Sequence, residues 1–124
     1  EFRRVLFRSR GIEIVTDALH LDEQVADADL VITGEGRIDS QTIHGKVPVG
    51  VARVAKRYNK PAIGIAGSLT ADVGVVHEHG LDAVFSVIYT ICSLEDALEN
   101  AQQNVQMAAR NIAAVIKVGQ GMSR

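Results

Sequence analysis

Residues 33–46 concentrate the side chains that bind phosphate groups and metal ions. They read TGEGRIDSQTIHGK and include two acids, two bases and three glycines. Glu35 and Asp39 are carboxylates of the kind that hold Mg²⁺ together with waters and phosphate oxygens. Arg37 and Lys46 can bind phosphate or carboxylate, arginine as a planar fork and lysine as a point charge. This segment is therefore the first candidate for a ligand site.

The other residues of the segment suit the same chemistry. Gly34 and Gly36 let the backbone approach a ligand closely. Ser40, Gln41 and Thr42 are neutral groups of the kind that read hydroxyls. A loop that only reverses the chain needs glycines but gains nothing from four charges, so we expect a binding loop rather than a plain turn.

Two known phosphate-binding motifs nearly fit the segment, and both fail. A P-loop would have Gly at position 40 and Ser or Thr at position 47, where Ser40 and Val47 stand. The dinucleotide fingerprint that starts at Gly34 would have its third glycine at position 39, where Asp39 stands. The segment thus predicts an anion and metal site of another type.

A second glycine-containing segment, residues 64–70, reads GIAGSLT. Gly67 and Ser68 would offer backbone N–H groups ahead of a helix, an arrangement that binds anions. A role for Ser68 or Thr70 as a simple helix N-cap explains the same residues equally well.

Three short apolar runs predict the strands that would position both segments. They cover Leu30–Thr33, Ala62–Ala66 and Ala83–Ile88, and a glycine directly follows each of the first two. Continuous runs of this kind are typical of buried parallel strands. In open α/β sheets, ligands bind outside the carboxyl ends of the strands, which is where both segments fall.

Helical periodicity fills the intervals between these strands. Asp22 is a predicted N-cap, and Gly80 is the predicted end of the helix before the third strand. Lys56 and Arg57 stand late in their helix, where basic residues suit the negative end of its dipole. The predicted helical segments are Gly11–Leu19, Asp22–Ala28, Val47–Tyr58 and Ala71–His79.

The last predicted helix has the strongest pattern. Ser93 is expected to cap it, with Asp96 three residues later as in a capping box. Apolar residues then recur at spacings of three and four from Leu94 to Val115, and Gly119 follows the end. A free coiled coil is the competing interpretation, but two alanines in the stripe favour close packing on a sheet.

The order of elements is α–β–α–β–α–β–α, which predicts an α/β fold. We expect a parallel sheet with flanking helices and right-handed crossovers. Three strands and a long C-terminal helix make an incomplete domain, so a longer parent protein is expected to supply the remaining strands.

Composition excludes several classes of partner. The 124 residues are 47% hydrophobic and 23% charged, with a net charge of −2. That charge favours neither nucleic acid nor an anionic membrane, and no apolar run approaches the roughly 20 residues that span a bilayer. The one cysteine, Cys92, allows no internal disulfide, which suits a reducing compartment such as the bacterial cytoplasm.

The first ten residues do not match the remainder. Residues 1–10 read EFRRVLFRSR, with four arginines and no clear period. We interpret them as a non-native cloning or adapter-derived segment and exclude them from the fold; a natural basic arm is the alternative. Residues 11–124 are treated as the domain.

Four residues of reactive types lack a supporting pattern. His77 and His79 are two apart, the wrong spacing for one face of a helix, and are expected to be solvated. His44 lies in the binding segment and could approach a substrate. Cys92 has no paired base and is expected to be a small buried or capping-region residue rather than a nucleophile.

The run LVITGEGRIDSQTIHGKVPVGVA, followed by KPAIGIAGSL, resembles the bacterial glycerate kinase family, of the glycerate 2-kinase type. The similarity extends from Gly11 to about Gly119. It implies phosphorylation of D-glycerate to 2-phosphoglycerate with ATP and Mg²⁺, in an enzyme with a Rossmann-like domain and a second domain inserted into it. This chain resembles only the C-terminal part of the Rossmann-like domain, so the fragment is expected to be inactive alone.

The resemblance also implies roles for the binding segment. Asp39 is expected to bind Mg²⁺ or to act as the base that orients the glycerate hydroxyl, with Glu35 as the second candidate. Arg37 would hold the glycerate carboxylate or a phosphate, and Lys46 a phosphate. The remaining residues expected to contact substrate hydroxyls or phosphate are Gly34, Gly36, Gln41, Thr42, Gly67 and Ser68.

Two other classes of function fit parts of the sequence. One is a non-catalytic nucleotide- or ligand-binding α/β module, against which the two acids argue because anion binding alone does not need them. The other is a subunit-interface piece whose long helix pairs with a partner through the apolar stripe of residues 94–115. The oligomeric state stays open.

Overall fold

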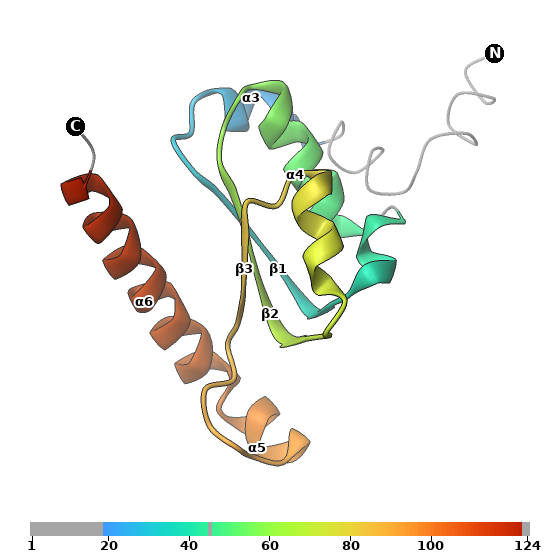
Figure 1. The fold of residues 1–124 in the computed structure, drawn as a ribbon, viewed down its shortest axis with the longest axis vertical. Helices are drawn as coiled ribbons and strands as arrows, with labels where there is room; N and C mark the ends of the chain where they lie inside the picture. Colours follow the sequence, from blue (N-terminus) through green and yellow to red (C-terminus); the bar gives the residue numbers. More distant parts are fainter. Residues whose placement is uncertain (1–18, 45, 123–124) are drawn as a thin grey trace.

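The computed structural model describes residues 19–44 and 46–122 of the chain. Within them, three parallel strands form one sheet in the order β1-β2-β3. The strands are β1 (Val31–Ile38), β2 (Ala62–Leu69) and β3 (Ala83–Ser86). The predicted α/β fold, a three-stranded parallel sheet with flanking helices and a long C-terminal helix, is confirmed (Figure 1).

Helices lie on both sides of this sheet. Figure 1 shows α4 (Val47–Arg57) close to the yellow 3-10 helix η2 (Val73–His79) on one side, and α6 (Ala101–Met122) on the other. The predicted segment Gly11–Leu19 lies outside the described residues except for its last residue. The helical elements are α3 (Leu21–Ala26), the 3-10 helix η1 (Ser40–Ile43), α4 (Val47–Arg57), the 3-10 helix η2 (Val73–His79), α5 (Leu94–Glu99) and α6 (Ala101–Met122).

The first two strands are longer than predicted. β1 was expected to end at Thr33 and β2 at Ala66, but the two pair in parallel as far as Ile38 and Leu69. The glycines that suggested loops also tolerate extended backbone, and each strand gives the other a hydrogen-bonding partner. A Cβ on Gly67 would lie 2.8 Å from the carbonyl oxygen of Gly36, so the two backbones approach closely at this point.

The short helices and β3 also differ from the predictions. The expected helix Ala71–His79 is a 3-10 helix that begins at Val73, and β3 ends at Ser86, whose hydroxyl accepts the Ile88 N–H at 3.0 Å. Gly80 ends η2 with a φ of 104°, as predicted. The N-cap position of α3 is His20, with a φ of 54°, so the predicted Asp22 cap is wrong.

The predicted last helix is two helices. Ser93 caps α5 as expected, since its hydroxyl accepts the Asp96 N–H at 3.1 Å. The helical conformation is interrupted at Asn100. The side-chain amide of Asn100 donates to the Asp96 carbonyl at 3.0 Å and so satisfies a carbonyl group in the last turn of α5. α6 continues through Gly119 to Met122, so the predicted end before Gly119 is wrong.

Most of the apolar stripe on α5 and α6 does not pack on the sheet. Leu94, Leu98 and Val115 are 76%, 69% and 60% exposed. Among the described residues of α6, Ala108 and Ile112 are the buried ones. The expected close packing on the sheet is therefore wrong for most of the stripe, and the interpretation of this helix as one that pairs with a partner keeps its basis.

The core lies between the sheet and the α4 side of the molecule. Gly80 fits there because its Cα faces α4, where an added Cβ would lie 3.3 Å from the Cβ of Ala52. Hydrophobic burial of this kind is the main stabilising contribution to such a fold. The buried side chains of this cluster come from α3, β1, α4, β2, η2 and the turn before β3. They include Val25, Val31, Ile38, Ala55, Ala62, Ala66, Val76 and Leu81.

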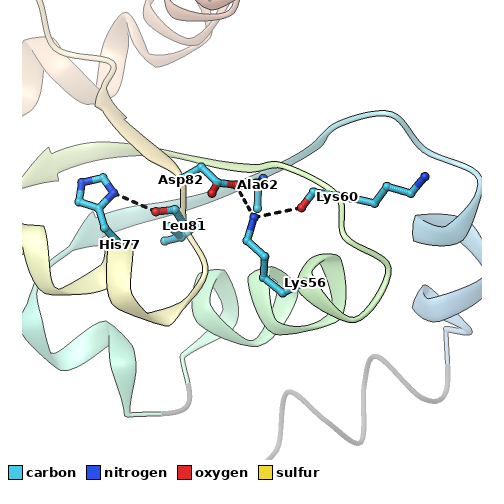
Figure 2. Close-up of polar contacts among 6 residues, drawn as sticks. All are labelled: Lys56, Lys60, Ala62, His77, Leu81 and Asp82. Carbon is cyan, nitrogen blue, oxygen red and sulfur yellow. Dashed lines mark hydrogen bonds and ion pairs between the residues drawn. The ribbon is translucent and has the colours of Figure 1, made fainter.

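Asp82 joins three elements at the amino end of the sheet (Figure 2). Its Oδ2 accepts hydrogen bonds from the Ala62 N–H at 2.8 Å and from Lys56 Nζ at 2.5 Å. Lys56 Nζ also donates to the Lys60 carbonyl at 3.2 Å, and the Asp82 N–H donates to the Ala62 carbonyl at 2.8 Å. These bonds hold the end of α4 and the first residues of β2 and β3 together.

The ionisation of Asp82 follows from the same contacts. Burial alone would raise the pKa of its carboxyl group, but the hydrogen bonds from Lys56 and Ala62 and the Lys56 charge outweigh that effect. The pKa of Asp82 therefore lies below its ordinary value. The carboxylate is charged at neutral pH and can serve as an acceptor for both donors.

Candidate functional site

The residues of the first predicted loop lie partly on strand β1. Val31, Thr33 and Ile38 are its buried positions, and the four residues between Thr33 and Ile38 are all exposed. The acidic and basic side chains therefore reach solvent although their backbone is paired with β2. The loop itself begins at Asp39, where β1 ends.

Asp39 is the carboxylate of the segment with the larger number of partners among the described residues. Its Oδ1 accepts the Gln41 N–H at 2.9 Å, and its own N–H donates to the Thr42 hydroxyl at 3.1 Å. Together these bonds form a capping box at the start of η1. The second carboxylate oxygen, Oδ2, lies 3.3 Å from Arg37 Nε. The carboxylate is thus fixed on one side, and its side chain keeps 22% of its surface exposed.

Thr42 anchors this arrangement from inside the protein. It is fully buried, and its oxygen accepts the Asp39 N–H. Contact with a substrate hydroxyl stays a prediction for Thr42, while the structure gives its oxygen a local task. Gln41 is exposed beside it, and its backbone N–H points to the Asp39 carboxylate.

Glu35 and Asp39 do not converge on one point. At the ordinary rise of a strand, four residues of extended chain separate their Cα atoms by about 13 Å. The Glu35 carboxylate turns to its neighbour and accepts the Gly36 N–H at 3.1 Å. Within the described residues, no group of three or more His, Cys, Asp or Glu side chains could hold a metal ion. Either carboxylate could join phosphate oxygens and waters at a Mg²⁺ ion, and the Mg²⁺ roles of Glu35 and Asp39 stay predictions.

Lys46 stands at the start of α4. It occupies the N-cap position and is exposed, and its carbonyl accepts the Gly50 N–H at 3.1 Å. Its own N–H donates to the Thr42 carbonyl at 3.3 Å, which ties α4 to η1. Lys46 therefore lies beside the segment that carries Asp39. It also stands at the N-terminus of α4, which is the positive end of the helix dipole.

The second predicted segment is also part of a strand. Gly67 and Ser68 belong to β2, where Ser68 pairs with Arg37. They do not precede a helix directly, so the predicted anion site from N–H groups ahead of a helix is wrong in its geometry. Neither Ser68 nor Thr70 is an N-cap, because Asp72 holds that position for η2.

Sequence reasoning missed Asp72. The Thr70 hydroxyl hydrogen-bonds to its carboxylate, and the Thr70 N–H donates to the Ile38 carbonyl at 3.3 Å. The hydrogen bond from the Thr70 hydroxyl holds the pKa of the Asp72 carboxyl below its usual value. Its position just after the second strand, at the same sheet edge as Asp39, was the available signal.

An apolar hollow of about 310 Å³ borders the carboxyl ends of β1 and β2. It lies between the sheet and the two C-terminal helices, so it brings α5 and α6 next to the glycines of the candidate site. Residues that line it include Gly36, Gly67, Ser68, Leu94, Leu98 and Val105.

The residues discounted from sequence show no sign of chemistry in the described chain. His77 and His79 are exposed, and His77 Nδ1 lies 2.9 Å from the Leu81 carbonyl oxygen. His44 is exposed at the end of η1. Cys92 is an exposed free thiol in the capping region before α5, so the alternative of a buried residue is wrong. None of the helices in residues 19–44 and 46–122 has the length and apolar character needed to cross a membrane.

The fold and the site define a class: an α/β protein whose acidic and basic side chains gather where two adjacent parallel strands end. A sequence model of the glycerate kinase family matches residues 7–117. Glycerate 2-kinase of Escherichia coli (strain K12) is 66% identical over 109 residues, 88% of this chain and 29% of that protein. Glycerate kinase of Bacillus subtilis (strain 168) is 55% identical over 113 residues, 91% of this chain and 30% of that protein.

A solved structure agrees with these sequence matches. The crystal structure of a candidate glycerate kinase 2 from Salmonella typhimurium LT2 shares 76% identity with a TM-score of 0.69, and the match covers 91% of this chain and 28% of that one. The chain belongs to the glycerate kinase family. It spans less than a third of the length of the relatives it matches.

Proposed function

We propose that this chain forms part of a kinase that transfers the γ-phosphoryl group of ATP to the 2-hydroxyl of D-glycerate. The observation that carries the proposal is the Asp39 carboxylate. It stands where β1 ends, next to the Arg37 guanidinium, in a chain of the glycerate kinase family. A carboxylate held at the carboxyl end of a parallel strand is well placed to meet a ligand.

The reaction forms one bond and breaks one. The 2-oxygen of glycerate attacks the γ-phosphorus of ATP, the bond from that phosphorus to the bridging oxygen breaks, and ADP leaves. The proton of the hydroxyl passes to the Asp39 carboxylate, which acts as the base. Such reactions depend mainly on positioning and on charge neutralisation, so the hydrogen bonds that fix Asp39 are part of the chemistry.

Arg37 and Lys46 supply the positive charges. In glycerate the carboxylate is attached to the carbon that carries the 2-hydroxyl, so a cation beside the base is suited to hold it. Arg37 Nε lies 3.3 Å from Asp39 Oδ2, and Arg37 is the proposed partner of the glycerate carboxylate. Lys46, exposed at the start of α4, binds a phosphate.

The remaining predicted contacts surround this centre. Gln41 is exposed beside Asp39 and reads a substrate hydroxyl, while Gly34 and Gly36 leave the surface of β1 open. Gly67 and Ser68 lie across on β2. A ligand at the strand ends would meet these residues through backbone and hydroxyl groups.

Mg²⁺ bound with ATP would neutralise charge on the β- and γ-phosphates. With Asp39 as the base, Glu35 is the proposed protein ligand, because its exposed carboxylate can take one coordination position beside phosphate oxygens and waters. The proposed setting is the bacterial cytoplasm. Because the chain spans less than a third of its relatives, we propose that the segment is inactive alone and that other parts of a full-length enzyme complete the site.

The test uses a full-length glycerate kinase that carries residues 19–122 of this chain, called the full-length enzyme below. ADP release is followed with Mg²⁺ and ATP, with D-glycerate in one reaction and other small hydroxy acids in parallel ones. The position of the new phosphate is read by ³¹P NMR. We expect ADP release with D-glycerate and a product phosphorylated on the 2-oxygen.

Each other outcome removes one part of the proposal. A product phosphorylated on the 3-oxygen would overturn the assigned hydroxyl and leave the kinase reaction in place. Release of ADP with another hydroxy acid alone would replace the substrate. Binding of Mg²⁺ and ATP without turnover of any acceptor would support the non-catalytic nucleotide-binding module instead.

A further inference from the structure

Thr42 is a buried polar residue within an exposed and charged segment. Its side chain is fully buried, whereas the Asp39 side chain keeps part of its surface in solvent and Lys46 is exposed. A hydroxyl is costly to bury unless it is hydrogen-bonded. The hydrogen bonds of Thr42 therefore show which part of the molecule this buried group serves.

Three hydrogen bonds join Thr42 to two charged residues of the candidate site. The Thr42 hydroxyl accepts the Asp39 N–H at 3.1 Å, and the Thr42 N–H donates to the Asp39 carbonyl at 3.1 Å. The Thr42 carbonyl accepts the Lys46 N–H at 3.3 Å. One buried residue is therefore bonded both to the proposed base and to the proposed phosphate-binding cation.

The bond from the Asp39 N–H to the Thr42 hydroxyl sets the direction of the Asp39 side chain. It holds Asp39 in extended conformation as the N-cap of η1. From that position the Asp39 Oδ1 accepts the Gln41 N–H at 2.9 Å. The two side-chain bonds form the capping box, in which each supports the other. Without the Thr42 hydroxyl, the carboxylate loses one of the two bonds that orient it.

The surroundings of Thr42 make it a firm anchor. Threonine is branched at Cβ, which restricts rotation about its first side-chain bond, and protein interiors are closely packed. The helix that carries it, η1, packs against both η2 and α4. Thr42 is thus held by the protein interior and passes its position on to Asp39 and Lys46 through hydrogen bonds.

We propose that Thr42 is a positioning residue for phosphoryl transfer, whose buried hydroxyl fixes the Asp39 carboxylate against the acceptor hydroxyl and in register with Lys46. This inference rests on the proposed function of Asp39 and Lys46, and it gives Thr42 a role in the protein frame rather than a contact with substrate. A displacement of about 1 Å in a reacting group can lower a rate by as much as a hundredfold. Loss of the Thr42 hydroxyl therefore acts on turnover more than on substrate binding.

The test compares variants of the full-length enzyme. Thr42→Val keeps the shape of the side chain and removes its hydroxyl, so we expect kcat to fall roughly tenfold to a hundredfold, with the KM for D-glycerate changed less than about twofold. Thr42→Ser keeps the hydroxyl and should keep most of the kcat. Ser93→Ala is the matched control: the Ser93 hydroxyl also accepts a backbone N–H at 3.1 Å, at the start of α5, and its loss should leave kcat unchanged.

Three results of this comparison would overturn the proposal. A kcat for Thr42→Val within about twofold of the Ser93→Ala value would remove the positioning role. A raised KM for D-glycerate with an unchanged kcat would make Thr42 a substrate contact instead. A kcat for Thr42→Ser as low as that for Thr42→Val would show that the hydroxyl is not the group that matters.

A double substitution shows whether Thr42 acts through Asp39. If it does, Thr42→Val combined with Asp39→Asn lowers kcat no further than Asp39→Asn alone, because the base that the hydroxyl positions is already lost. Independent effects that multiply would contradict the proposed route.

Amide hydrogen exchange gives a readout that does not depend on turnover. The Gln41 N–H donates to Asp39 Oδ1, so its exchange rate reports how firmly the carboxylate is held. It should exchange faster in Thr42→Val and at the original rate in Ser93→Ala, and unchanged exchange in Thr42→Val would contradict the proposal. A full-length enzyme without kinase activity would remove the proposed function, while this exchange result would still decide whether Thr42 orders the Asp39 carboxylate.

Discussion

Asp39 and Asp82 are similar carboxylates at opposite ends of one sheet. Each accepts a backbone N–H, from Gln41 at 2.9 Å and from Ala62 at 2.8 Å. Each also pairs with a cation, Arg37 for Asp39 and Lys56 for Asp82. The two sites therefore use nearly the same set of interactions.

The partners of the two carboxylates come from different distances along the chain. Those of Asp39 lie within three residues of it, so its bonds orient its own side chain and join few other parts of the molecule. Those of Asp82 are 20 and 26 residues away, so its bonds hold separate elements together. Local partners prepare a carboxylate for a ligand, and distant partners make it a support of the fold.

The largest effect on stability is expected from the backbone at the carboxyl end. Gly67→Ala would place a Cβ 2.8 Å from the Gly36 carbonyl oxygen, so β1 and β2 must shift apart. We expect the free energy of unfolding of the full-length enzyme to fall by about 2 kcal/mol, as for other overpacked sites. Chemical denaturation with urea measures the change.

Gly74→Ala is the control for that substitution. An added Cβ at Gly74 meets nothing within 4 Å among the described residues, so the free energy of unfolding should stay the same or rise by up to about 1 kcal/mol. Equal stability for Gly67→Ala and Gly74→Ala would show that the backbones at the carboxyl end are loosely packed.

A smaller effect is expected at the amino end. Asp82→Asn keeps the shape of the side chain and removes its charge, which weakens the bond with Lys56. Because about half of the Asp82 side chain is exposed, we expect a loss of only about 1 kcal/mol in the free energy of unfolding. No change in kcat should accompany it, and a large fall in kcat would break the proposed division between the two ends.

The pH dependence of stability gives a second test of Asp82. The pKa of its carboxyl is lower in the folded protein than its ordinary value of 3.8. Its contribution is therefore present above the unfolded pKa and is lost as the pH falls through the folded one. Thermal unfolding between pH 6 and pH 3 should show a smaller acid-induced loss in Asp82→Asn than in the unsubstituted enzyme; equal slopes would contradict this assignment.

The smallest effect is expected from a surface pair outside both sites. Arg57 Nη1 lies 3.2 Å from Asp22 Oδ2, and half of the Arg57 side chain is exposed. Exposed ion pairs contribute little, so Arg57→Ala should lower the free energy of unfolding by about 0.3 kcal/mol. A loss as large as that for Asp82→Asn, measured in the same denaturation series, would contradict the small contribution expected of an exposed ion pair.

The existence of the strands could be predicted from sequence, but their ends could not. Apolar runs before Gly34 and Gly67 identified β1 and β2, because continuous apolar residues are typical of buried parallel strands. The exposed residues that follow look like loops when each is considered alone. They extend as strands because Arg37 and Ser68 meet in register, and that pairing depends on both segments at once.

The candidate site shows the same limit. Asp39 was predictable because it stands among other polar residues just after a strand, whereas the hydrogen bond from the Thr70 N–H to the Ile38 carbonyl joins the two loops across 32 positions of chain. Periodicity likewise predicted helical structure from Leu94 onward but not the break at Asn100 or the exposure of the stripe. A period identifies the apolar face of a helix, but tertiary contacts decide what that face meets.

The most direct test of the account is the kcat of Asp39→Asn in the full-length enzyme, measured beside its unfolding temperature. Asparagine keeps an acceptor for the Gln41 N–H but cannot take a proton from the acceptor hydroxyl. With Asp39 as the base, kcat with D-glycerate should fall about a hundredfold or more while the unfolding temperature stays unchanged. An unchanged kcat would contradict the account and remove Asp39 from the chemistry.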